Sequence, residues 1–267
     1  MTKLNNKLPK VLVIAGSDSC SGAGIQADLK AITLNNVYAS TVVTCLTAQN
    51  TQKVYEVLET PHNFLKSQLQ AVLSDIEFSV IKTGMLVSQE IINCIAEELK
   101  KISYNFKLLI DPVMVATSGD ILLQNNAIEA LKTKLISKAF LVTPNIDEAE
   151  ILADMPIKNI EDMKKSALLI KKIGARAVLV KGGHLNFSDK KIHSVLLDEN
   201  NQFTLIANAR VDVDKIHGTG CTLASAISAN LAKDLDLINS CQIANNFVYK
   251  SAQNYQIIGK GSAVLGF

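Results

Sequence analysis

Short apolar runs alternate with stretches of helical periodicity along most of this chain, and this alternation limits the possible folds more than any other feature. The apolar runs are expected to form buried strands, at residues 11–15, 41–46, 78–81, 107–110, 140–143 and 177–180. Between them lie helical stripes such as Ile91, Ile92, Ile95, Leu99 and Ile102. Such alternation is typical of a mostly parallel sheet with crossover helices. Segments 191–197 and 202–207 flank Asp-Glu-Asn-Asn and predict a small antiparallel edge hairpin.

Composition agrees with a single large globular domain over residues 1–267. The chain is 48% hydrophobic and 19% charged, and no linker, repeat or low-complexity tract divides it. The net charge of +2 comes without a block of Lys and Arg, which argues against nucleic acid and favours a small-molecule partner. The five cysteines include no CxxC pair, so neither a disulfide framework nor a zinc site is indicated. Because we find no signal-peptide pattern and no membrane-length apolar run, we expect a cytoplasmic protein without a membrane partner.

The residues that follow the predicted strands carry most of the polar chemistry. These exits begin at Gly16, Thr47, Thr83, Asp111, Pro144 and Gly182. In open α/β sheets the ligand binds outside the carboxyl ends of the strands, so we expect the exits to meet at one crevice.

Two nucleotide-binding motifs are absent from the sequence, which narrows the possible ligands. Gly22-Ala-Gly24 lacks the third glycine of a dinucleotide fingerprint, and no GxxxxGK[ST] sequence occurs, which disfavours a dinucleotide dehydrogenase and a Walker-type ATPase.

The segment Ile216-His-Gly-Thr-Gly-Cys-Thr222 precedes the apolar stripe of a predicted helix. The N–H groups of a first helical turn favour an anion such as phosphate, and glycines at 218 and 220 let the backbone approach it closely. At such a position the pKa of Cys221 is expected to fall. The same residues also fit a plain helix start with a small buried cysteine, because Cys is among the most buried residue types.

A series of motifs, in chain order, carries a family resemblance: IAGSDSCSGAGIQADLKAI, LTAQNT, IKTGM, LLIDPVM, ATSGDILL, VTPNIDEAEIL, VLVKGGH and HGTGCTLASAI. Together they resemble the hydroxymethylpyrimidine/phosphomethylpyrimidine kinases of thiamine synthesis, in the ribokinase superfamily. The resemblance implies a three-layer α/β/α ribokinase-like fold. It also implies ATP-dependent phosphorylation of 4-amino-5-hydroxymethyl-2-methylpyrimidine, and then of the resulting monophosphate.

The resemblance also has consequences for cofactors, assembly and alternative functions. It implies ATP and Mg²⁺ as cofactors, leaves a monovalent cation open, and implies a homodimer. A related branch phosphorylates pyridoxal, pyridoxine or pyridoxamine, and a pyridoxal kinase is therefore the first alternative. A catalytically idle pyrimidine- or pyridoxal-binding protein is a further one.

The resemblance assigns phosphoryl transfer to residues 218–221 and to Lys181. The amides of Gly218, Thr219 and Gly220 would stabilise charge on the transferring phosphate, as a loose phosphoryl-transfer transition state requires. Cys221 stands where most of the superfamily has an aspartate base. A thiolate there could act as base, or the thiol could only orient the hydroxyl. Lys181 would neutralise phosphate as a point charge; its alternative role is that of a solvated lysine at a strand end.

The stretch Asn145-Ile-Asp-Glu148 resembles the superfamily motif whose glutamate helps to hold Mg²⁺ near the phosphates, largely through water. Mg²⁺ keeps several waters and takes few carboxylates, which fits so sparse a site. An asparagine N-cap followed three residues later by glutamate also resembles a capping box, which would stabilise a helix start with or without a metal role. Asp111 resembles a second acidic contributor to the metal or phosphate region, and its alternative role is that of a turn aspartate.

A further set of residues resembles the pyrimidine site of the family. Asp28 and Gln49 would hydrogen-bond the ring, whose donors and acceptors suit an acid and an amide. Gly16, Met85 and Val113 would line the faces of the ring. Asp28 could instead be an acidic residue favoured in the first turns of a helix, and Gln49 could be a loop amide.

The chain departs from the family pattern in two places. Ser21 stands where a glycine is common, which leaves the loop conformation open, and residues 259–267 lack the usual Gly-Pro-Val-Asn-His ending. The histidines have no metal-ligand spacing. We interpret His217 as a supporting residue at most, and the others, His62, His184 and His193, as structural or surface residues.

Overall fold

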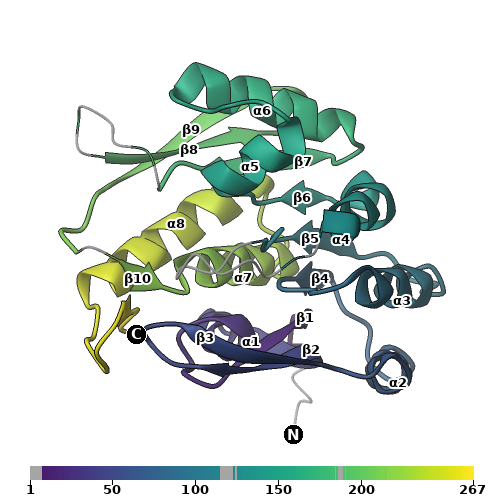
Figure 1. The fold of residues 1–267 in the computed structure, drawn as a ribbon. Coiled ribbons are helices and arrows are strands. Elements are labelled where there is room, and N and C mark those ends of the chain that lie inside the picture. The colour runs from purple at the N-terminus through teal and green to yellow at the C-terminus, as the bar shows by residue number, and fades with distance from the viewer. Residues whose placement is uncertain are drawn as a thin grey trace, which may run out of the picture.

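The structure, a computed structural model, describes residues 8–114, 123, 125–183, 185, 189, 191–213 and 215–267. A nine-stranded sheet of order β3-β2-β1-β4-β5-β6-β7-β8-β9 runs through the molecule (Figure 1). Its strands are β1 (Lys10–Asp18), β2 (Tyr38–Gln49), β3 (Val54–Glu59), β4 (Val80–Thr83), β5 (Lys107–Ile110), β6 (Leu141–Val142), β7 (Ala177–Lys181), β8 (Lys191–Leu197) and β9 (Phe203–Ala209).

The middle of this sheet is parallel and both edges are antiparallel. Strands β2, β1, β4, β5, β6 and β7 pair in parallel, as the alternation of strands and helices predicts. Strands β8 and β9 form the predicted edge hairpin. The opposite edge carries β3, paired antiparallel with β2, which the sequence pattern does not predict. The reason is physical: most β3 side chains are exposed, so the strand lacks the apolar alternation that marks a half-buried strand.

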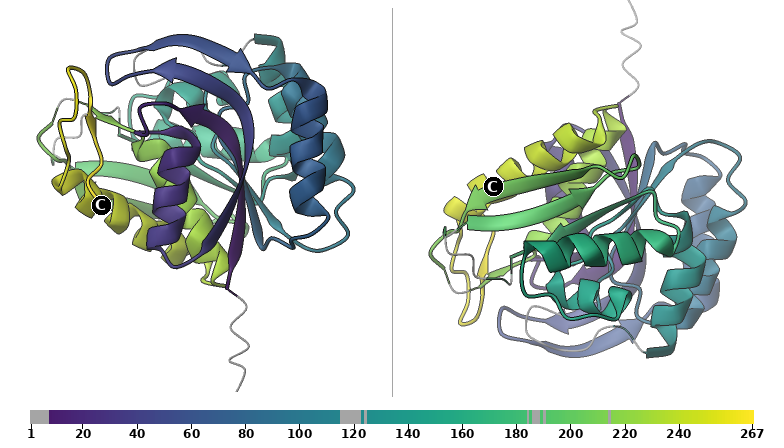
Figure 2. Two further views of the ribbon diagram at one scale, coloured as in Figure 1. Left: turned by 90° about the horizontal axis from the view of Figure 1, so that it is seen from below. Right: turned by 90° about the horizontal axis from the view of Figure 1, so that it is seen from above.

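Helices cover both faces of the sheet and complete the predicted three-layer fold (Figure 2). One face packs against α1 (Gly24–Leu34), α7 (Thr219–Ala232) and α8 (Leu237–Gln253). The other packs against α2 (His62–Leu73), α3 (Gln89–Leu99), α4 (Asn125–Ala130), α5 (Ile146–Ala153) and α6 (Ile160–Lys172). A π-helical turn (Leu131–Leu135) and a 3₁₀ turn (Ile136–Lys138) continue α4.

Strand β1 shows why the central strands read as continuous apolar runs. Its residues Leu12 and Ile14 belong to the core on one face of the sheet, whereas Val11 and Val13 belong to the core on the other. Since successive side chains of a strand point to opposite faces, a strand covered on both sides is apolar at every position.

Strands β1 and β2 extend beyond their predicted ends, and these extensions carry polar residues. The apolar runs end at residues 15 and 46, but the strands continue to Asp18 and Gln49. A second, two-stranded sheet pairs β10 (Ile216–His217) with β11 (Ala263–Val264), which brings the C-terminal segment beside the start of α7. Within the described ranges, no helix has both the length and the apolar character needed to cross a bilayer.

Candidate active site

Helix α7 begins where the sequence predicts an anion site. Gly218 is its N-cap and has φ of 82°, in the left-handed region that favours glycine. A Cβ on Gly218 would lie 1.8 Å from the carbonyl oxygen of Gly22, so no side chain fits there. Glycine also has no side chain to cap the first-turn amides of Thr219, Gly220 and Cys221, which leaves these amides to a ligand or to water.

Lys181 and Asp111 lie directly beside this helix start. Lys181 Nζ is 2.8 Å from Asp111 Oδ1, and Thr143 Oγ1 donates to the same oxygen at 3.0 Å. A Cβ on Gly220 would lie 3.3 Å from Lys181 Nζ and 4.0 Å from Asp111 Oδ2. The ends of β5 and β7 therefore meet the first turn of α7, as expected for a crevice at the carboxyl ends of parallel strands.

Burial and charge act in opposite directions on this pair. Burial raises the pKa of Asp111, but Lys181 and Lys82 outweigh that effect and hold the pKa of Asp111 below its ordinary value. Burial likewise lowers the pKa of Lys181, and Asp111 and Glu148 outweigh it, so the pKa of Lys181 is raised. Both groups are consequently charged at neutral pH. Lys181 is a partly buried cation, with 13% of its side chain exposed.

Asn145 and Glu148 form the capping box that their spacing predicts. Asn145 Oδ1 accepts the backbone N–H of Glu148 at 2.8 Å, and Glu148 Oε2 accepts the backbone N–H of Asn145 at 2.8 Å. The backbone of Met114 also hydrogen-bonds the Glu148 carboxyl. Burial raises the pKa of Glu148 to about 7, with Lys181 opposing the rise. The capping role is thus confirmed, and the metal role stays a prediction.

The residues at this place fit a sparsely held magnesium ion. Glu148 and Asp111 are buried carboxyls, and the negative charge of Asp111 raises the pKa of Glu148. A bound divalent cation would offset this repulsion. Among the described residues no group of three or more His, Cys, Asp or Glu side chains could hold a metal. A cation here would therefore draw most of its ligands from phosphate oxygens and water, as Mg²⁺ commonly does.

Cys221 differs from the sequence-based expectation in its ionisation. The expected fall of its pKa at a helix N-terminus is wrong for this structure, because burial raises the pKa to about 12. The charge of Lys82 and a backbone hydrogen bond from Gly24 favour the thiolate, but Asp28 and Asp111 oppose it and desolvation is larger. Cys221 keeps part of its surface exposed. It is therefore a protonated thiol facing the crevice.

Asp28 and Lys82 form a fully buried ion pair. Lys82 Nζ lies 2.8 Å from Asp28 Oδ1, Ser225 Oγ donates to the same oxygen at 2.6 Å, and neither charged side chain has exposed surface. Asp28 is the fifth residue of α1, within the first turns of the helix as the alternative interpretation has it, and it is in addition paired with Lys82. Its Oδ2 has no hydrogen-bond partner in the described part of the chain, and the predicted contact with a ring rests on that oxygen.

Lys82 is a functional candidate that sequence reasoning missed. The signal was present: a lysine stands inside the otherwise apolar segment 80–83, where a buried charge requires a partner. Its positive charge favours the thiolate of Cys221 and the carboxylates of Asp28 and Asp111. Lys82 therefore places a fixed charge below the surface of the crevice.

The residues predicted to line a ring lie in or just after three neighbouring strands of the sheet, β1, β4 and β5. Gly16 packs against Met85 and Cys45: a Cβ on Gly16 would lie 3.3 Å from Met85 Sδ and 2.7 Å from Cys45 Sγ. Thr44 Oγ1 fixes this arrangement by donating to the Met85 carbonyl at 2.7 Å. Val113 follows β5, the strand next to β4 in the sheet, and is partly buried. Residues 116–122, in the ATSGDILL motif, and His184 lie outside the described residues.

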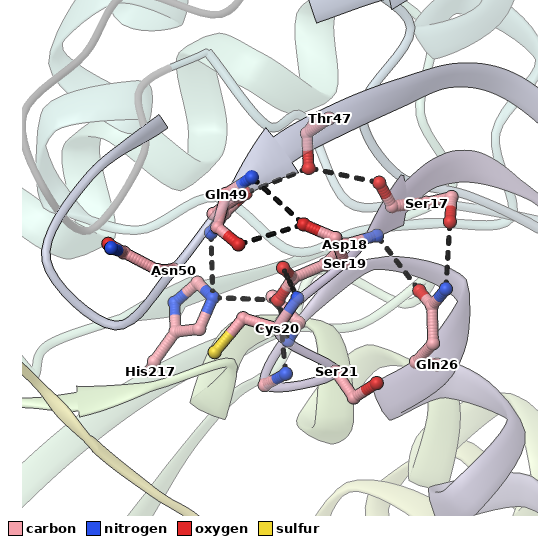
Figure 3. Close-up of polar contacts among 12 residues, drawn as sticks. Ser17, Asp18, Ser19, Cys20, Ser21, Gln26, Thr47, Gln49, Asn50 and His217 are labelled. Carbon is pink, nitrogen blue, oxygen red and sulfur yellow. Dashed lines mark hydrogen bonds and ion pairs between the residues drawn. The ribbon is translucent and has the colours of Figure 1, made fainter. Parts of the chain in front are cut away.

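Gln49 lies in a polar cluster at the ends of β1 and β2 (Figure 3). Its side-chain amide lies 2.9 Å from His217 Nε2, and the same ring nitrogen lies 3.0 Å from Asp18 Oδ2. His217 also packs against Gly22, where a Cβ would lie 2.4 Å from the ring. His217, which directly precedes the N-cap of α7, therefore connects Gln49 and the loop after β1 to the start of that helix. Gln49 is more than the loop amide of the alternative interpretation, since it ends a strand and is held by His217.

This fold and this juxtaposition of a glycine-rich helix start, a buried lysine and two carboxyls define a ribokinase-like small-molecule kinase. A family model described as phosphomethylpyrimidine kinase matches residues 18–265. The chain therefore belongs to the phosphomethylpyrimidine kinase family.

Sequence relatives and a solved structure agree with this family. The chain is 40% identical over 266 residues to the chloroplastic thiamine biosynthetic bifunctional enzyme of Arabidopsis thaliana, covering 99% of this chain and 50% of that protein. It thus spans about half the length of this curated relative. It is 38% identical to the hydroxymethylpyrimidine/phosphomethylpyrimidine kinase of Bacillus subtilis, covering 94% of this chain and 92% of that one. A pyridoxal kinase of Bacillus subtilis, solved as an ADP complex, superposes with a TM-score of 0.88 at 30% identity, covering 97% of each chain.

Proposed function

We propose that this protein is an ATP-dependent kinase that phosphorylates 4-amino-5-hydroxymethyl-2-methylpyrimidine and then its monophosphate. One observation carries the proposal: the first turn of α7 lies against the buried Lys181–Asp111 pair, with Gly220 next to Lys181 Nζ. Backbone amides and a lysine aimed at one place are what stabilisation of a transferring phosphoryl group needs. A lysine held beside two carboxyls at a helix start suits the charge of a transferring phosphate, and this favours a kinase over the idle alternative.

The pyrimidine is preferred to pyridoxal as substrate on the strength of sequence similarity. The matching family model is that of phosphomethylpyrimidine kinase, and the curated kinase from Bacillus subtilis is 38% identical to this chain. The pyridoxal kinase of similar fold is 30% identical. Fold alone does not decide between the two substrates, because one fold hosts several functions.

Within this proposal the residues have distinct roles. The amides of Gly218, Thr219 and Gly220 hold the transferring phosphate, and Lys181 neutralises it. Cys221, protonated in this structure, orients the acceptor hydroxyl rather than acting as a standing thiolate, and the hydroxyl proton passes to an oxygen of the transferred phosphate. A loose transition state needs little assistance from a base, which supports this role.

Glu148, Asp111 and the supporting Asn145 would hold Mg²⁺ at the phosphates. When bound, the ion neutralises phosphate charge. The buried carboxyl of Glu148, with its pKa raised to about 7, supports a cation at this place.

On the ring side we keep Gln49 and Asp28 as the polar contacts, with Gly16, Met85 and Val113 lining the ring. The partial exposure of Gln49 and the packing of Gly16 on Met85 support this assignment. The buried position of Asp28 makes its contact the weaker of the two.

A direct assay separates the candidate functions. The pure protein is incubated with ATP and Mg²⁺, and kcat/KM is measured for the hydroxymethylpyrimidine and for pyridoxal. We expect turnover of both the pyrimidine and its monophosphate, with a higher kcat/KM for the pyrimidine than for pyridoxal. Turnover of pyridoxal alone would support the pyridoxal kinase instead. Binding of either compound without turnover would support the idle binding protein.

We further propose a cytoplasmic homodimer built from one domain per chain. All five cysteines are free, which suits a reducing compartment. The edge formed by β2 and β3 exposes apolar side chains that a second copy would cover: Leu46, Tyr55, Val57 and Leu58. The continuous nine-stranded sheet supports a single domain. Light scattering coupled to gel filtration tests the dimer, and Leu58→Lys is expected to yield monomer.

A further inference from the structure

Three side chains from distant parts of the chain meet around one ring nitrogen (Figure 3). Asp18 ends β1, Gln49 ends β2 and His217 lies in β10. His217 Nε2 is 3.0 Å from Asp18 Oδ2 and 2.9 Å from the side-chain amide of Gln49. The other end of that amide lies 3.2 Å from Thr47 Oγ1. One histidine nitrogen thus touches both a buried carboxylate and a residue proposed to bind the substrate.

Asp18 is fixed as a hydrogen-bond acceptor. Its carboxylate accepts the backbone N–H groups of Cys20 at 2.8 Å, Gly22 at 3.0 Å and Ala23 at 2.8 Å. Burial raises the pKa of Asp18, but His217 and these amides outweigh burial and hold the pKa below its ordinary value. An ionised carboxylate only accepts hydrogen bonds. His217 therefore carries a hydrogen on Nε2 where it faces Asp18.

This hydrogen determines which end of the Gln49 amide faces His217. A protonated Nε2 has no lone pair for an amide N–H, so the favourable neighbour is the amide oxygen. At the other end, the single hydrogen of Thr47 Oγ1 has the Ser17 carbonyl at 3.0 Å as its acceptor, so Thr47 accepts from the amide nitrogen. In the structure the nitrogen faces His217 and the oxygen faces Thr47, and a half-turn of the amide exchanges them without moving another atom.

We propose that His217, held by Asp18, is a positioning residue that turns the Gln49 amide so that it offers an N–H donor to the substrate ring. One amide hydrogen is then bound by Thr47 and the second is available to a ring nitrogen. Gln49 borders an open pocket of about 430 Å³, lined also by Cys20, Asn50 and Lys260. The specificity so obtained is for a heterocycle with an acceptor nitrogen, since a ring without one leaves the donor unpaired. The inference rests on the proposed function in taking Gln49 as a substrate contact.

Kinetics of variants separate this positioning role from a structural one. We expect His217→Ala to raise KM for the pyrimidine about tenfold, the loss of about one hydrogen bond, with kcat within about twofold of the parent. His217→Gln keeps an N–H donor and is expected to restore most of the KM. On a Gln49→Ala background, His217→Ala is expected to raise KM no further, because its effect acts through Gln49. His62→Ala, at the exposed start of α2, is the control and is expected to leave KM unchanged.

Other results would overturn the proposal. A loss of kcat without a change in KM, or KM effects that multiply in the double variant, would mean that His217 does not act through Gln49. Nitrogen-15 NMR of histidine-labelled protein reads the ring hydrogen directly, and an Nε2 without hydrogen in the ligand-free wild type would contradict the orientation. If wild-type protein does not turn over the pyrimidine, the proposed function fails, and the NMR result still decides the amide orientation.

Discussion

Lys181 Nζ lies 2.8 Å from Asp111 Oδ1, although the two residues are 70 positions apart in the sequence. The pair joins the end of β7 to the end of β5 at the first turn of α7. It is largely removed from water, with 13% and 2% of the two side chains exposed. Burying an ion pair costs desolvation energy. Such pairs are therefore found preferentially where the charge has a function.

Removing the charge of Lys181 is expected to affect both catalysis and stability. In Lys181→Met the transferring phosphate loses a cation, and we expect kcat to fall about a hundredfold or more. Asp111 would be left buried without its partner, and we expect the free energy of unfolding to fall by about 3 kcal/mol. Steady-state kinetics and urea denaturation measure the two effects. Lys191→Met, an exposed lysine at the start of β8, is the matched control, and equal losses in both variants would contradict the role of Lys181.

Glu148 is expected to make stability depend on pH near neutrality. Burial raises its pKa from 4.5 to about 7, so between these values the folded state keeps a proton that the unfolded state has lost. The stabilisation is fully present below pH 4.5 and is lost as the pH rises through about 7. We expect the unfolding free energy of wild type to fall by about 2 kcal/mol more than that of Glu148→Gln between pH 5 and pH 8.

Glu148→Gln is the suitable reference because glutamine can keep the capping box with Asn145 while removing the titration. Urea denaturation at several pH values, without nucleotide or metal, gives the difference directly. A constant difference between the two proteins over this range would show that Glu148 titrates at an ordinary pKa.

Cys221 is expected to react slowly with iodoacetamide at neutral pH. Burial raises its pKa to about 12, so the reactive thiolate is scarce. In a Cys20→Ser background, which removes the other partly exposed thiol, the alkylation rate should keep rising beyond pH 9. A rate that levels off by pH 7 would show the standing thiolate that we exclude. Cys221→Ser, which keeps a group able to orient the hydroxyl, is expected to retain kcat within about tenfold.

Ser21 is expected to be a source of backbone strain that glycine relieves. Its φ is 63°, in the left-handed region, and a glycine commonly stands there in the resembling family. The strain relieved in Ser21→Gly exceeds the entropy cost of glycine by about 0.5 kcal/mol, so the Tm should rise by about 1–2 °C. Ser21→Val, with a β-branched side chain in the same conformation, should lower it. The opposite order of Tm values in a thermal melt would contradict the strain.

The sequence predicted those parts of the fold that local pattern determines. Buried strands were found because a strand covered on both faces is apolar throughout, as in 107–110, where prediction and structure coincide. The capping box of Asn145 and Glu148 was equally local, since both bonds join residues three apart. The meeting of Lys181 with Asp111 could be expected only from the rule that strand ends converge.

Other features depend on tertiary contacts that no local pattern records. Strand β3 is too exposed to show apolar alternation. The pairing of Lys82 with Asp28 joins β4 to α1 across 54 positions. The pKa of Cys221 was mistaken in direction, because a helix N-terminus is visible in sequence whereas the desolvation that outweighs it is not.

The most direct test of the central claim is the fate of the γ-phosphate. The protein is incubated with γ-³²P-labelled ATP, Mg²⁺ and the hydroxymethylpyrimidine, and the products are separated by chromatography at successive times. We predict label first in the pyrimidine monophosphate and then in the diphosphate, with Lys181→Met slowing both. Label that stays in ATP, or passes to pyridoxal but never to the pyrimidine, would contradict the account.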